Sequence, residues 1–182
     1  MFTDKMLQLV GVGILETFYM TLSATALAYL IGLPLGLVLV ISDPAGIHPM
    51  PKLNKVLGAI INFLRAAPFL ILLMLLIPFT RLLIGTTIGS SAMIPPLFIA
   101  AFPFVARMVE SSVKEVDAGV VEAAQSMGAS TLQIVCKVLL PEAKPSLLLG
   151  ATIAITTILG YSAMAPSPST TATIAKSMTS WP

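Results

Sequence analysis

The sequence predicts an all-α integral membrane protein with four transmembrane helices and one polar loop on the cytoplasmic side. Only 10% of its 182 residues are charged and 57% are hydrophobic, whereas soluble domains carry about 25% charged residues. Its apolar runs approach or exceed the roughly 20 residues that a helix needs to cross the bilayer core. A single long polar stretch, residues 110–144, interrupts these runs.

The first predicted span covers residues 17–41, with no charge after Glu16. It contains Gly32 and Gly36, a spacing that lets helix backbones approach closely. Two interpretations stay open for this pair. The glycines pack or kink the helix within the chain, or they form the contact between two copies of it.

The remaining predicted spans cover residues 56–79, 92–109 and 145–164. The second contains a charge, Arg65, and the fourth begins at Pro145, a residue well suited to the first turn of a helix. The second span contains Pro68 and Pro78, and the third contains Pro95, Pro96 and Pro103. We expect those of the third span to act as kinks.

Basic residues divide unevenly between the two sides of this four-span arrangement. One side carries Lys52, Lys55, Arg107, Lys114, Lys137 and Lys144, and the other carries Lys5, Arg81 and Lys176. Because cytoplasmic loops are enriched in Lys and Arg, the polar stretch is predicted to face the cytoplasm. The amino terminus then faces outward.

The polar stretch is predicted to begin with a short helix capped by Asp117. Its apolar positions recur at helical spacing: Val116, Val120, Ala123, Ala124 and Met127. Gly128 suits the left-handed residue that ends such a helix. We expect Glu122 to project from the exposed surface, while the small Ala123 and Ala124 permit close approach by a partner.

A second helix is predicted to follow, because residues 130–133 read as a capping box. It can continue to Leu140, and Pro141 is expected to limit it. Such a helix–turn–helix unit, parallel to the membrane face, has two interpretations. It lies on lipid headgroups as an amphipathic hairpin, or it binds a soluble partner.

The spacing of the loop favours the partner. Glu122-Ala123-Ala124, then Gly128, and finally Val138 with Leu140-Pro141 resemble the cytoplasmic signature of ABC-importer permeases, although that family favours Ile at the position of Val138. In that family the loop forms a coupling helix that sits in a groove of the ATP-binding subunit. The resemblance therefore assigns docking to Glu122, Ala123, Ala124, Gly128 and Ala129, with Leu140 and Pro141 ending the motif.

Four further segments resemble the methionine-importer permeases: residues 63–69, 77–81, 106–110 and 159–164. The resemblance implies a homodimeric permease in the bacterial inner membrane, two ABC ATP-binding subunits and an outward-facing substrate-binding lipoprotein. The implied substrate is D- or L-methionine. ATP and Mg²⁺ would be bound by the partner subunit, with no cofactor in this chain.

The resemblance covers about residues 10–165, and we expect a permease domain at 1–165. Residues 166–182 form an atypical polar tail, where the family continues with a glycine-rich loop and a fifth span. Our hypothesis is that the last span is missing because the gene is truncated or frame-shifted.

Other residues carry weaker expectations. Arg65 is expected to reach toward headgroups or form an ion pair, or else to mark the transport path. Tyr161 and Met164 pack between helices or line that path. His48 has no second histidine or cysteine near it, so no metal site is expected.

Alternative functions follow from the same composition. An intramembrane protease would need a nucleophile and a base, but no pair of carboxylates lies within a span and the only histidine lies in a loop. No catalytic residue is therefore expected, and scattered basic residues give no support to nucleic-acid binding. A permease for another small solute and a non-transport membrane scaffold remain as alternatives, and co-purification of an ATPase would separate them.

Overall fold

The computed structural model describes residues 2–84 and 90–162, and every regular element within these ranges is helical. The elements are α1 (Phe2–Ile41), α2 (Pro51–Ala66), α3 (Phe69–Ile84), α4 (Ser90–Lys114), α5 (Ala118–Ser126), α6 (Thr131–Ile134), the π-helix η1 (Val135–Leu139), α7 (Leu140–Glu142) and α8 (Lys144–Ser162). The predicted all-α class is confirmed. The polar tail at 166–182 and Met164 lie outside the described residues.

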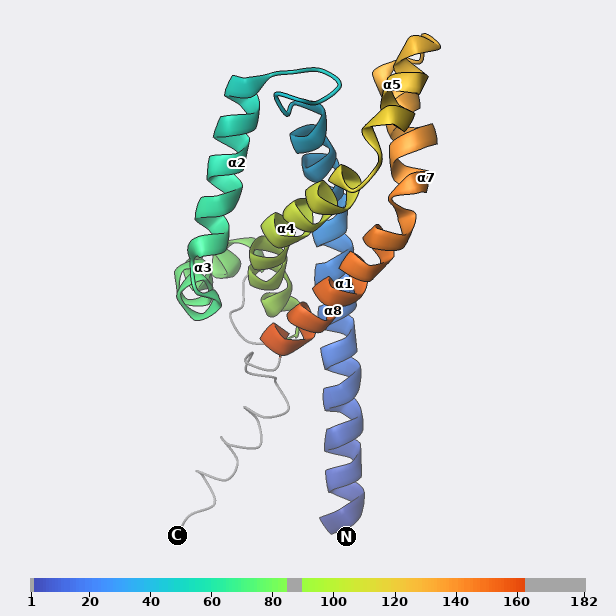
Figure 1. Ribbon diagram of the computed structural model, residues 1–182. Helices are drawn as coiled ribbons and strands as arrows, with labels where there is room; N and C mark the ends of the chain where they lie inside the picture. Colours follow the sequence, from blue (N-terminus) through green and yellow to red (C-terminus); the bar gives the residue numbers. More distant parts are fainter. Residues whose placement is uncertain (1, 85–89, 163–182) are drawn as a thin grey trace.

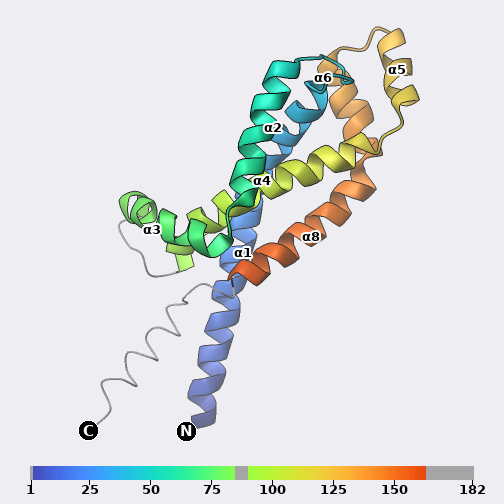
Figure 2. The same ribbon diagram turned by 60° about the vertical axis from the view of Figure 1, so that its left-hand side comes forward.

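Helix α4 is the centre of the bundle and contacts α1, α2, α3 and α8. Figure 1 shows α1 as a long rod, with α4 and α8 crossing it at mid-height. The loop from α1 to α2 and the hairpin that begins with α5 lie at one end of the molecule, opposite the amino terminus (Figures 1 and 2). This arrangement gathers the segments that the charge bias assigned to the cytoplasm.

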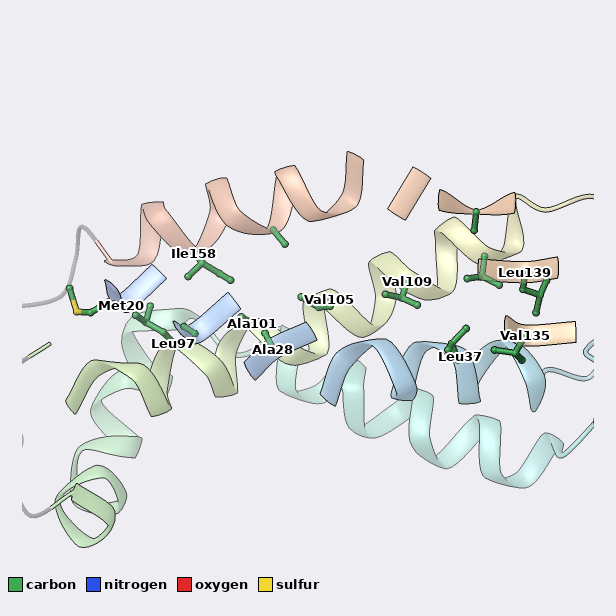
Figure 3. Close-up of a cluster of buried hydrophobic side chains, with 14 of the residues drawn as sticks. Met20, Ala28, Leu37, Leu97, Ala101, Val105, Val109, Val135, Leu139 and Ile158 are labelled. Atoms are coloured by element: carbon green, nitrogen blue, oxygen red, sulfur yellow. The ribbon is translucent and has the colours of Figure 1, made fainter. Parts of the chain in front are cut away.

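The core follows one stripe of α4 in which every fourth residue is buried. Leu97, Ala101, Val105, Val109 and Val113 are each at most 2% exposed. Residues four apart lie on the same face of a helix, so this stripe is continuous. Figure 3 shows that part of α1 lies along it, with Ala28 and Leu37 labelled there.

Gly32 and Gly36 face this stripe, so the pair serves packing within the chain. A Cβ atom on Gly32 would lie 2.8 Å from Cγ1 of Val105, and one on Gly36 would lie 2.6 Å from the carbonyl oxygen of Ala106. Real Cβ atoms essentially never approach other atoms so closely. The close contact between α1 and α4 therefore requires glycine, which has no side chain, at positions 32 and 36.

Among the residues that the structure describes, three helices are long and apolar enough to cross a membrane: Val10–Ile41, Ser91–Lys114 and Lys144–Ser162. The second predicted span is two helices, α2 and α3, which meet at 95° and count as a fourth span only if taken together. Ala67 at the break is extended, with φ −72° and ψ 125°. A residue that precedes proline disfavours the helical region, so Pro68 explains the break.

The other prolines do not interrupt their helices. Pro78 lies inside α3, and Pro95, Pro96 and Pro103 lie inside α4. Pro103 is fully buried among the core residues. Proline content alone therefore did not indicate which of these positions would end a helix.

Candidate functional site

The polar stretch folds into a hairpin, which we call the α5–η1 hairpin (residues 118–139). Its first helix begins as predicted, because Oδ1 of Asp117 accepts a hydrogen bond from the Gly119 amide at 2.7 Å. Its end is a Schellman motif. The Gly128 amide donates to the Gln125 carbonyl, and the Ala129 amide donates to the Ala124 carbonyl.

Gly128 has φ +77°, the left-handed conformation that glycine adopts without steric cost. The predicted role of this residue as a helix terminator is confirmed. No heavy atom outside its immediate neighbours lies within 4 Å of the position that a Cβ would occupy. A side chain introduced here would therefore point into open space as far as the described chain is concerned.

The second helical segment of the hairpin, α6, begins with the predicted capping box. The Gln133 amide donates to Oγ of Ser130 at 3.4 Å, and the Ser130 amide donates to Oε1 of Gln133 at 2.9 Å. Both ends of the turn are thus fixed by hydrogen bonds between near neighbours.

Pro141 does not end the second helix, contrary to prediction. The chain passes from α6 through η1 and α7 into α8 as one nearly continuous helical path. The Leu140 amide donates to the Val135 carbonyl, five residues back, instead of four. This wider π-type turn lies directly before the proline and accommodates the ring that would clash in a regular helix. The second helix of the hairpin therefore leads into α8 through η1 and α7.

The inner face of the α5–η1 hairpin packs against the core. Ala124, Ile134, Val135 and Leu139 are each at most 5% exposed and belong to the same buried cluster as α1 and α4. Figure 3 places Val135 and Leu139 beside Leu37 of α1. Ala124, which was expected to permit close approach by a partner, is buried and packs α5 onto the molecule.

The outer face of α5 is exposed and weakly polar. Met127 is 81% exposed and Val120 44% exposed, and Ala123 and Glu122 are also exposed. Val120, Ala123 and Met127 are spaced three and four residues apart, so they share one helical face. Large apolar side chains that stay exposed together on a hairpin indicate an interaction surface.

A cavity of about 230 Å³ separates α5 from the end of α1 and the loop that follows it. Gly46 and Ile47 line it on one side, and Val121, Glu122 and Gln125 line it on the other. Glu122 thus lies at the rim between this cavity and the outer face of α5.

A chain of charged groups fixes the base of the hairpin. Arg107 Nη1 pairs with Glu110 at 2.5 Å, and Lys114 Nζ pairs with Glu110 at 2.9 Å and with Asp43 at 2.8 Å. Arg107 Nη2 also donates to the Gly58 carbonyl of α2 at 3.0 Å. We call these four side chains the Asp43–Arg107 network. It joins α4 to the loop after α1 and to α2, directly before α5.

The sequence analysis used Arg107 and Lys114 to orient the chain and residues 106–110 for the resemblance, but it did not predict this network. The spacing of Arg107, Glu110 and Lys114, three and four residues apart on one helix, was the available signal. The participation of Asp43 depends on tertiary structure. The hydrogen bond from Lys114 and, secondarily, the Ala45 amide hold the pKa of the Asp43 carboxyl below its usual value.

The remaining predicted residues are distributed over the molecule. Arg65 and Tyr161 come together at the junction of α2 and α3 and line one cavity. Leu140 and Pro141 form the start of α7, at the base of the hairpin. Among the described residues, no group of three His, Cys, Asp or Glu side chains is placed to hold a metal ion.

Comparison with known proteins places these features in context. The sequence profile described as "Binding-protein-dependent transport system inner membrane component" matches residues 32–167. The chain is 46% identical over 162 residues to the D-methionine transport system permease protein MetI of Salmonella typhimurium, covering 89% of this chain and 75% of that protein. It is 50% identical over 150 residues to a probable D-methionine permease of Vibrio cholerae, covering 82% and 67% respectively.

A solved structure shares the fold. The described helices superpose on a chain from an inward-facing MetNI methionine ABC transporter with a TM-score of 0.87 and 46% sequence identity. The match covers 88% of this chain and 74% of that one.

Proposed function

The chain belongs to the family of binding-protein-dependent transport system inner membrane components, and from this premise we propose that it is the permease subunit of an ATP-driven methionine importer. Proteins of this family are membrane transport components rather than enzymes. The relatives named above transport D-methionine, and the identity of about 46% over most of the chain supports the same substrate here. The expected permease domain at 1–165 is part of this proposal.

The proposed partners are a second copy of the permease, an ABC ATP-binding subunit and a substrate-binding lipoprotein. The observation that carries the proposal is the exposed outer face of α5 on a hairpin fixed at both ends by capping hydrogen bonds. Glu122, Ala123, Gly128 and Ala129 are the docking residues we propose. Ala124 contributes indirectly, because it holds α5 against the core.

The connection of the hairpin to the bundle supports a mechanical role. Its second helix continues into α8, and the Asp43–Arg107 network joins its base to the loop after α1 and to α2. In our proposal, ATP binding closes the two ATP-binding subunits and moves each docked hairpin inward. The two permease chains then rotate between inward- and outward-facing states, a rigid-body transition known in other systems.

The test is the pair Gly128→Asp and Gly128→Asn. Both short polar side chains tolerate the left-handed backbone of this position, and their Cβ would have no heavy atom of the described chain within 4 Å beyond its immediate neighbours. We expect Gly128→Asp to insert into the membrane normally, to lose the co-purifying ATP-binding subunit and to abolish ATP-dependent methionine uptake. Gly128→Asn controls for backbone strain, because it differs from the aspartate only in charge.

Normal uptake by Gly128→Asp would remove the hairpin from the mechanism. The substrate is tested separately, by uptake of labelled D- and L-methionine in cells that lack other methionine importers. Uptake of a different amino acid, together with retention of the ATP-binding subunit, would keep the transport proposal and change the substrate.

A further inference from the structure

A second cavity, of about 160 Å³, lies where α2 breaks into α3, and four helices meet there. Arg65 comes from the end of α2 and Phe69 from the start of α3, while Phe104 belongs to α4 and Tyr161 to α8. The 95° bend at Pro68 opens this space between the helices. Its volume equals about five water molecules in the liquid, which suits a small solute.

The aromatic walls of the cavity are fixed by their contacts. The rings of Phe69 and Tyr161 are stacked, with centroids 4.5 Å apart and planes 8° apart. The guanidinium carbon of Arg65 lies 6.0 Å from the centroid of the Phe104 ring, within the range of a cation–π contact. Phe104 therefore orients the Arg65 side chain toward the cavity that both residues line.

The depth of Arg65 argues against a simple reach to the headgroups. It lies ten residues after Lys55 in the same helix, which corresponds to about 15 Å along the helix axis. The hydrocarbon core is about 30 Å thick. If Lys55 marks the headgroup boundary, Arg65 lies near the middle of the membrane, where a charge is costly unless it meets an opposite charge or water.

The described part of the chain places no carboxylate near Arg65. Within the described ranges, Arg65 is exposed and no acidic side chain lies within ion-pair distance of it. Of the eight acidic residues in the sequence, six lie at 43 and between 110 and 142, at the end of the molecule that includes the hairpin. Glu16 lies about 37 Å along α1 from Ile41, farther than the thickness of the core, and Asp4 comes before it.

A second copy of this chain would bring the same distribution of acids. The described chain thus leaves the Arg65 guanidinium, at the wall of a cavity, without an anionic side chain to meet it. Lipid phosphates stay at the membrane surface, whereas a solute carboxylate that enters the cavity can reach this charge.

We propose that this cavity is a subsite of the translocation path in which Arg65 binds the carboxylate of the amino-acid substrate. The proposal rests on the proposed function. The planar guanidinium can bind a carboxylate through two parallel hydrogen bonds. The faces of Phe69 and Tyr161 contact the thioether side chain, since sulfur packs favourably against aromatic rings.

The test is protection of a cysteine placed in the cavity wall, measured on the assembled permease and ATP-binding subunit in lipid. Ala100 lines the cavity, so Ala100→Cys is made together with Cys136→Ser, which removes the chain's own thiol. We expect methionine to slow modification by a small thiol reagent. Methioninol, which lacks the carboxylate, should not protect.

The variant Arg65→Gln should raise the methionine concentration needed for protection by about 10- to 100-fold, the loss expected for a hydrogen bond to a charged group. In Arg65→Lys the methionine concentration needed for protection should lie between those of wild type and Arg65→Gln, because lysine keeps the positive charge but lacks the planar guanidinium. Arg81→Gln is the matched control, since it removes the same charge outside the cavity. Equal protection by methioninol and methionine, or equal effects of Arg65→Gln and Arg81→Gln, would overturn the proposal.

Uptake gives a second measurement that does not need the introduced cysteine. The methionine concentration that half-saturates uptake should rise in Arg65→Gln with the ATP-binding subunit still bound, and an unchanged value would also overturn the subsite. A wild-type transporter that binds its ATPase but does not move methionine would instead refute the proposed substrate.

Discussion

The close contact between α1 and α4 makes a quantitative prediction about Gly36. In Gly36→Ala, the new Cβ would lie 2.6 Å from the Ala106 carbonyl oxygen and 2.7 Å from Cβ of Val109, where ordinary contact begins at 3.4 Å. Neither neighbour is the flexible end of a long side chain, so the two helices must separate by nearly 1 Å. Overpacking of this kind costs about 1–3 kcal/mol.

Gly11→Ala is the control, because the same helix offers nothing within 4 Å of its Cβ. Alanine favours a helix over glycine by about 0.5–1 kcal/mol, and this gain applies to both variants. The difference between them therefore isolates the packing cost of about 1–3 kcal/mol. Unfolding by a denaturing detergent, followed by circular dichroism in mixed micelles, measures it. Equal unfolding midpoints for the two variants would refute the reasoning.

Three further predictions concern the hairpin and its base. Cys136, the single cysteine, is exposed in η1, so an impermeant maleimide should label it in inside-out vesicles and not in intact cells. Labelling from outside would place the hairpin on the wrong side of the membrane for an ATPase. Met127→Asp should reduce co-purification of the ATP-binding subunit without lowering the yield of inserted permease, because Met127 is 81% exposed. Unchanged co-purification would count against the outer face of α5 as the docking surface. Asp43→Asn should destabilise the protein by about 0.2–1 kcal/mol at neutral pH, as for other partly exposed ion pairs. The pKa of Asp43 is lowered in the fold. The carboxylate therefore stabilises the protein above about pH 4 and loses this effect as the pH falls through the lowered pKa. If the difference in unfolding free energy between Asp43→Asn and wild type does not shrink in acid, the pairing with Lys114 is contradicted.

The Asp43–Arg107 network joins α4, the helix that leads into the α5–η1 hairpin, to the loop after α1 and to α2. Movement of α5 reaches α8 through the helical path that includes η1, and it reaches the loop after α1 through Lys114 and Asp43. This geometry favours concerted movement of α1, α4 and α8 in the proposed transport cycle.

Several local features were predictable because neighbouring residues determine them. The cap at Asp117, the left-handed Gly128 and the capping box at 130–133 each depend on hydrogen bonds that span five residues or fewer. Short-range hydrogen bonds need only the local sequence. The spacing of the signature loop was likewise visible in the sequence, and it led to the family that the comparisons support.

Other features needed the tertiary structure, because they join residues far apart in the chain. The burial of Ala124 depends on η1, and the ion pair of Lys114 depends on Asp43, seventy-one residues earlier. The sequence alone determined the membrane class and the hairpin, since composition and capping are local properties, and the orientation it predicts from charge stays a prediction that Cys136 labelling tests. Only the packed helices decided that Gly32 and Gly36 let α1 approach α4 closely, that Pro68 breaks a span while Pro103 does not, and that Arg65 and Tyr161 line one cavity. These outcomes depend on which surfaces come into contact.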